Sequence, residues 1–182
     1  AVQMVYNELD KGTKVATLGP IIHNQDVVND MAKRGARIIN TVDELQPDET
    51  VVIRSHGVGR EIYEQIQRKG NRMLDATCPF VSKIHKIVDR KTKEGCFILI
   101  AGDANHPEVQ GIVGHCDENC LVFKDNFELN HFFENLDKNF QKTIAFVAQT
   151  TYNILVWEKC LKIIPQDDPD IVISDTTCNA TE

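Results

Sequence analysis

The sequence predicts an α/β fold made of two small parallel-sheet units related by internal pseudo-symmetry. Short apolar segments alternate with amphipathic helical segments along the chain, a pattern typical of parallel sheets with flanking helices. Residues 97–101 and 144–148 are almost wholly apolar, as expected of strands that helices cover on both faces. The pattern Asp-x-Thr-Cys occurs at 75–78 and again at 175–178, which indicates an internal duplication.

Each helix is predicted from apolar residues that recur at helical spacing. Residues 1–11 place Ala1, Val2, Val5 and Leu9 on one face. The next helices span 24–36, 60–70 and 79–95. Gly70 is a stop signal for the second of these, and Pro79 suits the first turn of the third. The later helices span 106–115, 126–136 and 152–164.

Strands are predicted where short apolar, β-type segments separate these helices. They fall within 12–20, 37–40, 50–55, 71–77, 96–102, 120–123, 143–150 and 170–177. The duplication places the first unit at 1–78 and the second at 79–176, with 177–182 as the start of a third unit.

Composition limits the kinds of partner. The 182-residue chain has a net charge of −7, which argues against nucleic-acid binding because such proteins usually carry a basic surface. No apolar segment is long enough to cross a membrane, so we expect no membrane partner. Six cysteines in a chain of this length do not resemble a disulfide scaffold, and reduced thiols in the cytoplasm are the better interpretation.

Reactive side chains follow most of the predicted strands. Because ligands of parallel α/β sheets bind beyond the carboxyl ends of the strands, these residues are the candidate site. A single histidine in a loop is most often an ordinary surface residue, but so many at equivalent positions are hard to assign to chance. In chain order they are His23, His56, Cys78, His106, Glu108, Thr150, Thr151 and Cys178.

The residue types indicate the chemistry. Two thiolates suit a metal or cluster, although a zinc ion wants four ligands and an iron–sulfur cluster three or four thiolates. Histidines suit a phosphate or diphosphate, and Glu108 could relay protons. Cys96 and Cys160 are predicted core thiols, and His85 and His131 are predicted surface residues. Trp157 and the phenylalanines at 127–133 are predicted to pack in the interior. The segment His115, Cys116, Cys120 has no second ligand pair nearby and is better explained as a loop than as a metal site.

Six motifs together resemble the family of 4-hydroxy-3-methylbut-2-enyl diphosphate reductase, the LytB-type enzyme. They are His23-Asn24, RSHGV at 54–58, DATCPFV at 75–81, NHPEVQG at 105–111, AQTTYN at 148–153 and DTTCNATE at 175–182. The resemblance implies three α/β units around a 4Fe-4S cluster held by three cysteines. It also implies reductive removal of the substrate hydroxyl, which gives isopentenyl and dimethylallyl diphosphate in the non-mevalonate pathway, with ferredoxin or flavodoxin as electron donor.

Carried onto this sequence, the resemblance assigns roles residue by residue. Cys78 and Cys178 match two cluster ligands, and Glu108 matches the proton-relay acid. Thr150 matches its hydroxyl partner, with Thr151 as a weaker neighbour. The residues that match the diphosphate pocket are His23, His56 and His106, and the catalytic set is Glu108, Thr150 and His106.

The sequence departs from the family pattern at both ends. The family's first ligand cysteine would precede Ala1, and its third unit would follow Glu182, so we expect an excised two-unit piece that turns over no substrate. Two other functions stay open. The chain could be a non-catalytic metal-binding or dimerisation module, or part of another iron–sulfur enzyme acting on a phosphate ester.

Overall fold

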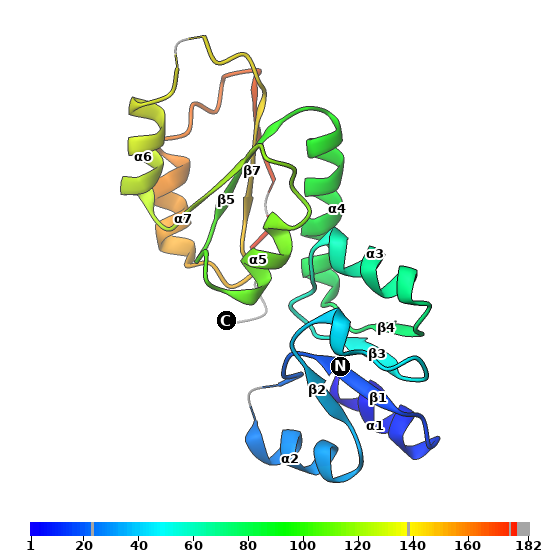
Figure 1. Ribbon diagram of the computed structural model, residues 1–182. Helices are drawn as coiled ribbons and strands as arrows, with labels where there is room; N and C mark the ends of the chain where they lie inside the picture. The colour runs from blue at the N-terminus through cyan, green and yellow to red at the C-terminus, as the bar shows by residue number, and fades with distance from the viewer. Residues whose placement is uncertain (23, 138, 175, 178–182) are drawn as a thin grey trace. The chain divides into compact units, whose positions relative to one another are not determined.

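The computed structural model describes residues 1–22, 24–137, 139–174, 176 and 177. The chain divides into two compact units, one at Ala1–Val81 and one beginning at Ser82 (Figure 1). Each unit contains a four-stranded parallel sheet, so the predicted α/β class is confirmed. The assignment of 177–182 to a third unit stays a prediction, since Cys178 and the residues after it lie outside the described ranges.

The first unit has strand order β2-β1-β3-β4. Its central strands β1 and β3 are buried along their whole length, while the edge strands β2 and β4 are partly exposed. In chain order the elements are α1 (Val2–Asp10), β1 (Val15–Leu18), α2 (Gln25–Lys33), β2 (Arg37–Ile39), the 3₁₀ turn η1 (Val42–Glu44), β3 (Thr50–Ile53), α3 (Arg60–Lys69) and β4 (Met73–Asp75).

The second unit repeats this topology with strand order β6-β5-β7-β8. Its elements are β5 (Phe97–Ala101), α5 (Pro107–Val113), β6 (Cys120–Phe123), α6 (Asn126–Glu134), β7 (Ile144–Ala148), α7 (Ile154–Leu161) and β8 (Ile171–Ile173). Helix α4 (Pro79–Lys93) precedes β5, and the division between the units falls within its first turn.

Strand β5 shows how helices come to cover both faces of the second sheet. Because successive side chains of a strand point to opposite faces, Leu99 and Ala101 pack against α6 and α7, whereas Ile98 and Ile100 pack against α4 and α5. Each face therefore has its own apolar core. The first unit is built the same way, with α1 and α2 over one face and α3 over the other.

Most of the local predictions are confirmed, and two are wrong. Cys96, Cys160 and Trp157 are buried as expected. His85, expected at the surface, is only 5% exposed because it lies on the same side of α4 as its buried neighbours Val81, Ile84 and Val88. Phe127, expected to pack in the interior, is 77% exposed at the start of α6. No helix among the described residues is long and apolar enough to cross a membrane.

Candidate functional site

The second unit holds a buried acid and alcohol beyond the carboxyl ends of β5 and β7. Glu108, in the first turn of α5, is 2% exposed, and Thr150, just after β7, is 8% exposed. The Thr150 backbone N–H donates to Glu108 Oε1 at 2.6 Å, and the Thr150 hydroxyl donates to Glu108 Oε2 at 2.8 Å. One residue thus binds both oxygens of the carboxylate, which fixes its orientation.

His106 lies next to this pair as the N-cap of α5. Its Nδ1 accepts the Glu108 backbone N–H at 3.2 Å. An acceptor nitrogen carries no proton, so the neutral imidazole bears its proton on Nε2. The Nδ1 edge of the half-buried ring therefore holds the helix start, and any hydrogen bond that the neutral ring donates comes from its Nε2 edge.

Gln149, next to Thr150 in the chain, connects the loops that follow β5 and β7. Its Oε1 accepts the Asp103 backbone N–H at 3.3 Å, and its Nε2 donates to Thr151 Oγ1 at 3.0 Å. Gly102 allows this close approach, because a Cβ there would lie 2.7 Å from Val109 Cγ2 and 3.0 Å from Gln149 Oε1. The loops after β5 and β7 are consequently joined into one rigid edge.

The first unit presents Cys78 beyond the carboxyl end of β4, the edge strand that corresponds to β8 of the second unit. The Cys78 backbone N–H donates to Ser55 O at 2.9 Å, which ties its loop to the loop after β3. Asp75 accepts hydrogen bonds from the Thr77 backbone N–H and hydroxyl, and Tyr63 donates to it at 3.1 Å. Burial, and then the neighbouring Asp75 carboxylate, raise the pKa of Tyr63 to about 12. The Tyr63 phenol therefore stays protonated and keeps the loop before Cys78 in place.

Arg54 brings a positive charge to the same edge. Its Nε is buried without a hydrogen-bond partner among the described residues, and burial lowers the pKa of its guanidinium. A Cβ at Gly19 would lie 2.8 Å from Arg54 Nη1, so the absence of a side chain there makes room for the guanidinium. His56 is half-buried in the loop that follows, where Gly57 turns the chain with φ of 69°.

The structure brings the predicted residues together within each unit. His106, Glu108 and Thr150 form one set, while His56 and Cys78 occupy two loops that the Ser55–Cys78 hydrogen bond joins. Thr151 is exposed and does not bind Glu108 directly. His23 and Cys178 lie outside the described residues.

Two neighbours were missed by the sequence analysis. Arg54 stands directly after β3 and Gln149 directly after β7, so both occupy the strand-end positions from which the other candidates were chosen. Their strand-end positions are the sequence signal that identifies them.

The described residues do not complete a metal site by themselves. They contain no group of three or more histidine, cysteine, aspartate or glutamate side chains that could hold a metal ion. Cys78, half-buried and fixed through its backbone, fits the requirement for one thiolate ligand. An iron–sulfur cluster needs further thiolates beyond it.

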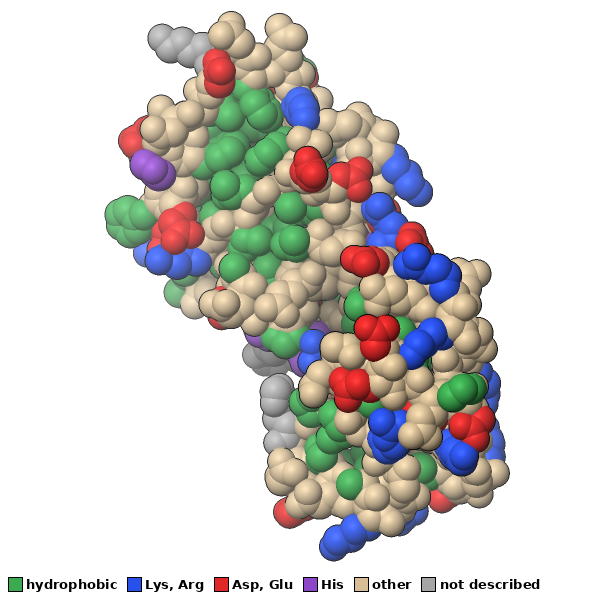
Figure 2. Space-filling view, in the orientation of Figure 1, with side chains coloured by type: hydrophobic (Ala, Val, Ile, Leu, Met, Phe, Trp, Pro, Cys, Tyr) green, Lys and Arg blue, Asp and Glu red, His purple; other side chains and the backbone are tan. Residues whose placement is uncertain are grey.

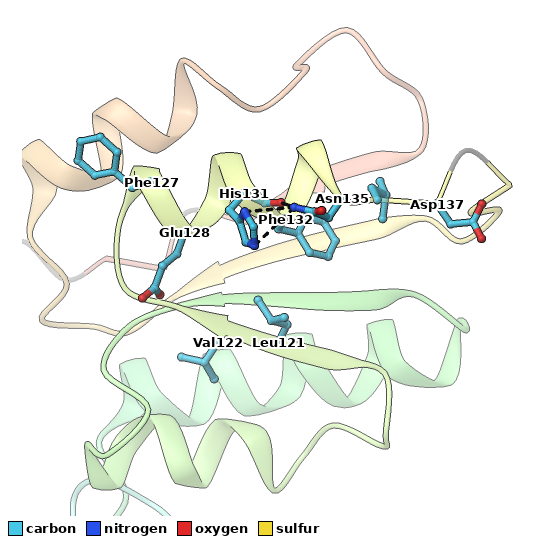
Figure 3. A pocket seen from close by; sticks show the side chains of 9 residues that line it. Leu121, Val122, Phe127, Glu128, His131, Phe132, Asn135 and Asp137 are labelled. Carbon is cyan, nitrogen blue, oxygen red and sulfur yellow. Dashed lines mark hydrogen bonds between the residues drawn. The ribbon is translucent and has the colours of Figure 1, made fainter.

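An apolar pocket of about 630 Å³ lies elsewhere on the second unit, between β6 and α6 (Figure 3). Leu121 and Val122 from the edge strand and Phe127 and Phe132 from the helix line it. Figure 2 shows apolar side chains gathered on this unit's visible face. None of the predicted site residues lines this pocket, so it is separate from the candidate site.

Comparison with known proteins decides the family. A family model described as LytB protein matches residues 1–182. The chain belongs to the LytB family. It is 39% identical over 186 residues to a LytB-family relative from Caldanaerobacter subterraneus subsp. tengcongensis named 4-hydroxy-3-methylbut-2-enyl diphosphate reductase, covering 100% of this chain and 62% of the relative.

Two solved LytB-family structures have the same fold. One, described as (E)-4-hydroxy-3-methyl-but-2-enyl diphosphate reductase, the terminal enzyme of the non-mevalonate pathway, matches with a TM-score of 0.79 and 32% identity over 99% of this chain and 64% of that chain. The Plasmodium falciparum reductase matches with a TM-score of 0.86 and 24% identity over 99% of this chain and 56% of that one, a likeness of fold. The chain thus spans about three fifths of the length of these three relatives.

Proposed function

We propose that this chain is part of a reductase that removes the hydroxyl group of (E)-4-hydroxy-3-methylbut-2-enyl diphosphate. The observation that carries the proposal is the buried Glu108–Thr150 pair beside His106, in a chain of the LytB family. The reaction takes up two electrons and two protons, breaks the carbon–oxygen bond and releases water. Its products would be isopentenyl and dimethylallyl diphosphate, the end of the non-mevalonate pathway.

Glu108 and Thr150 would handle the protons. A carboxyl group that is held in one orientation can pass a proton to a leaving oxygen through a hydroxyl that already contacts it. The Thr150 hydroxyl donates to Glu108 here, and it can rotate to donate to a substrate alcohol once Glu108 carries the proton. The rigid edge around Gln149 would keep this pair in register.

His106, His56 and His23 would bind the diphosphate, with Arg54 as an added positive charge. The Nε2–H edge of His106 can donate to a phosphate oxygen. The half-buried Arg54 favours an anion close by, because its buried Nε has no hydrogen-bond partner among the described residues. Arginine matches phosphate geometry well.

Cys78 and Cys178 would supply two of the thiolates for a 4Fe-4S cluster, which, when bound, would provide electrons and hold the substrate oxygen. The backbone bond from Cys78 to Ser55 would position that thiolate at the strand end. The electrons would come from a partner such as ferredoxin or flavodoxin.

The decisive experiment is anaerobic reconstitution with iron and sulfide, followed by a dye-linked reductase assay with the allylic diphosphate. It should be run on this chain and on a polypeptide of the relatives' length that contains it. We expect the long form to bind iron and release water from the substrate, with activity lost in Glu108→Gln. Turnover of unrelated phosphate esters at equal rates, or none of the allylic diphosphate by a cluster-loaded long form, would contradict the proposal.

A matched pair of variants tests His106 separately. His106→Asn keeps a side chain that caps the helix, whereas His106→Ala removes the cap. Both should lose affinity for the diphosphate, measured as a raised KM, while only His106→Ala should lose stability. A normal KM in His106→Asn would remove His106 from the diphosphate site.

A further inference from the structure

A second group of reactive side chains lies at the opposite end of the second sheet. Cys116 follows α5 and Cys120 begins β6, so three residues separate them. Cys120 pairs with Ile98 near the amino-terminal end of the parallel strands, whereas Glu108 and Thr150 lie beyond the carboxyl-terminal ends. This cysteine pair is therefore distinct from the site proposed above.

The two thiols are in contact. Both side chains are half-buried and pack against the same apolar cluster, which includes Ile98 and Ile112. The Cys116 thiol donates to Ile112 O at 3.6 Å, and it is also within hydrogen-bonding reach of Cys120, to whose thiolate its single proton can turn. Two sulfur atoms within hydrogen-bonding reach need little further movement to bond, and the loop between them can supply it.

The contact also activates one of the two sulfurs. The hydrogen bond from Cys116 lowers the pKa of Cys120 to about 7, against the opposing effect of burial. Near neutral pH a large share of Cys120 is then thiolate, the form that attacks disulfides. The titratable and charged groups in this region include Asp89, Asp117, Glu118, Lys142, which donates to Asn119 Oδ1 at 2.6 Å, and the stacked rings of His85 and His115, whose centroids are 4.1 Å apart.

We propose that Cys116 and Cys120 form a reversible redox pair, which a low-molecular-weight disulfide oxidises to an intramolecular disulfide. The Cys120 thiolate attacks one sulfur of the small disulfide, whose S–S bond breaks and releases one small thiolate. Cys116 then loses its proton and attacks the Cys120 sulfur, which releases the second small thiolate. The protein dithiol loses two electrons and two protons, and the small disulfide becomes two thiols.

Oxidation would act on the helix that carries the proposed acid. The disulfide would join the end of α5 to the start of β6, and Glu108 lies in the first turn of this same short helix. The redox state of the pair would therefore limit the motion of α5 relative to the sheet. This consequence holds whatever reaction the candidate site performs.

The test uses the whole 182-residue chain in buffers of reduced and oxidised glutathione at pH 7. After quenching and alkylation, cleavage on the carboxyl side of glutamate separates the two cysteines, because Glu118 lies between them. We expect the peptides 109–118 and 119–128 to become linked as the buffer grows more oxidising, and to separate again on reduction. Linkage through Cys96, or full alkylation of both cysteines in every buffer, would overturn the proposal.

Variants at Cys116 test the activation. Cys116→Ser keeps a hydrogen-bond donor beside Cys120, whereas Cys116→Ala removes it. In both, Cys120 should stop at a mixed disulfide with glutathione. At pH 7 this mixed disulfide should form about threefold more slowly in Cys116→Ala, because a smaller fraction of Cys120 is thiolate. The higher nucleophilicity of that thiolate offsets part of the loss. Equal rates in Cys116→Ser and Cys116→Ala would show that Cys116 does not activate Cys120. As a control, Cys96→Ala should form the disulfide between Cys116 and Cys120 at the rate of the parent chain.

Discussion

Replacing Thr150 by valine tests whether the hydroxyl bond to Glu108 holds the candidate site together. Valine has nearly the same shape, so the change removes the 2.8 Å bond to Glu108 Oε2 but leaves the backbone bond to Oε1. Both residues are buried, so in the variant Glu108 Oε2 would have neither the Thr150 hydroxyl nor bulk water as a hydrogen-bond donor. Leaving a buried acceptor without its donor costs about 2 kcal/mol.

The assay is urea unfolding followed by the fluorescence of Trp157, the sole tryptophan, which is buried in the second unit. A unit of this size has a urea dependence of about 1–2 kcal/mol per molar, so the midpoint should fall by about 1–2 M. Thr151→Ser is the matched control, because Thr151 is exposed and serine keeps the hydroxyl that accepts from Gln149 Nε2, so the change should cost less than about 0.5 kcal/mol. Equal midpoints for the two variants would refute the argument that the Thr150 hydroxyl stabilises the buried carboxylate.

Three further outcomes are expected. Gly102→Ala should destabilise the second unit by about 1–3 kcal/mol in the same Trp157 assay, because the new methyl group would clash with Val109 and Gln149. Gly114→Ala should be nearly neutral, because Gly114 has a φ of −66°, which alanine adopts without strain. His106→Ala should cost about 1 kcal/mol through loss of the N-cap, and His106→Asn should restore most of it, as thermal unfolding would show. Hydrogen bonds from Lys11 and then Arg72 lower the pKa of Glu8 to about 2. The stability that Glu8 contributes is therefore present above about pH 4.5 and is lost as the pH falls toward 2. Unfolding followed by circular dichroism should find Glu8→Gln less stable than the parent chain at pH 7 and equally stable near pH 2.

The order of helices and strands could be predicted from the sequence because apolar periodicity is a local property. Gly70 ends α3 because glycine adopts the left-handed φ of 76° found there, and Pro79 begins α4 because proline suits a first helical turn. The capping box of Thr41 and Glu44 was visible too but was not used. The strand ends then gave most of the candidate site, since parallel strands bring their carboxyl ends to one edge.

What could not be predicted depends on contacts between distant residues. Nothing in the sequence shows that Thr150 binds Glu108 through two bonds, or that Gly102 makes room for Gln149. The burial of His85 was predictable in part, because it lies four residues after Val81 in the helical repeat. Its stacking on His115 follows from the packing of α4 against the end of α5, which the local pattern does not contain.

The bonds between Glu108 and Thr150 have an evolutionary consequence. Strands β5 and β7 pair in one register, with Ala101 opposite Ala148, and this register brings Thr150 to the acid. A slip of one residue would offer Gln149 or Thr151 instead. Insertions and deletions between these strands can therefore accumulate at exposed positions between α6 and β7 such as Asn139 and Gln141, whereas Leu136 and Phe140 there pack against the core. The strands and the turns at their carboxyl ends should keep a constant length among proteins that use this acid.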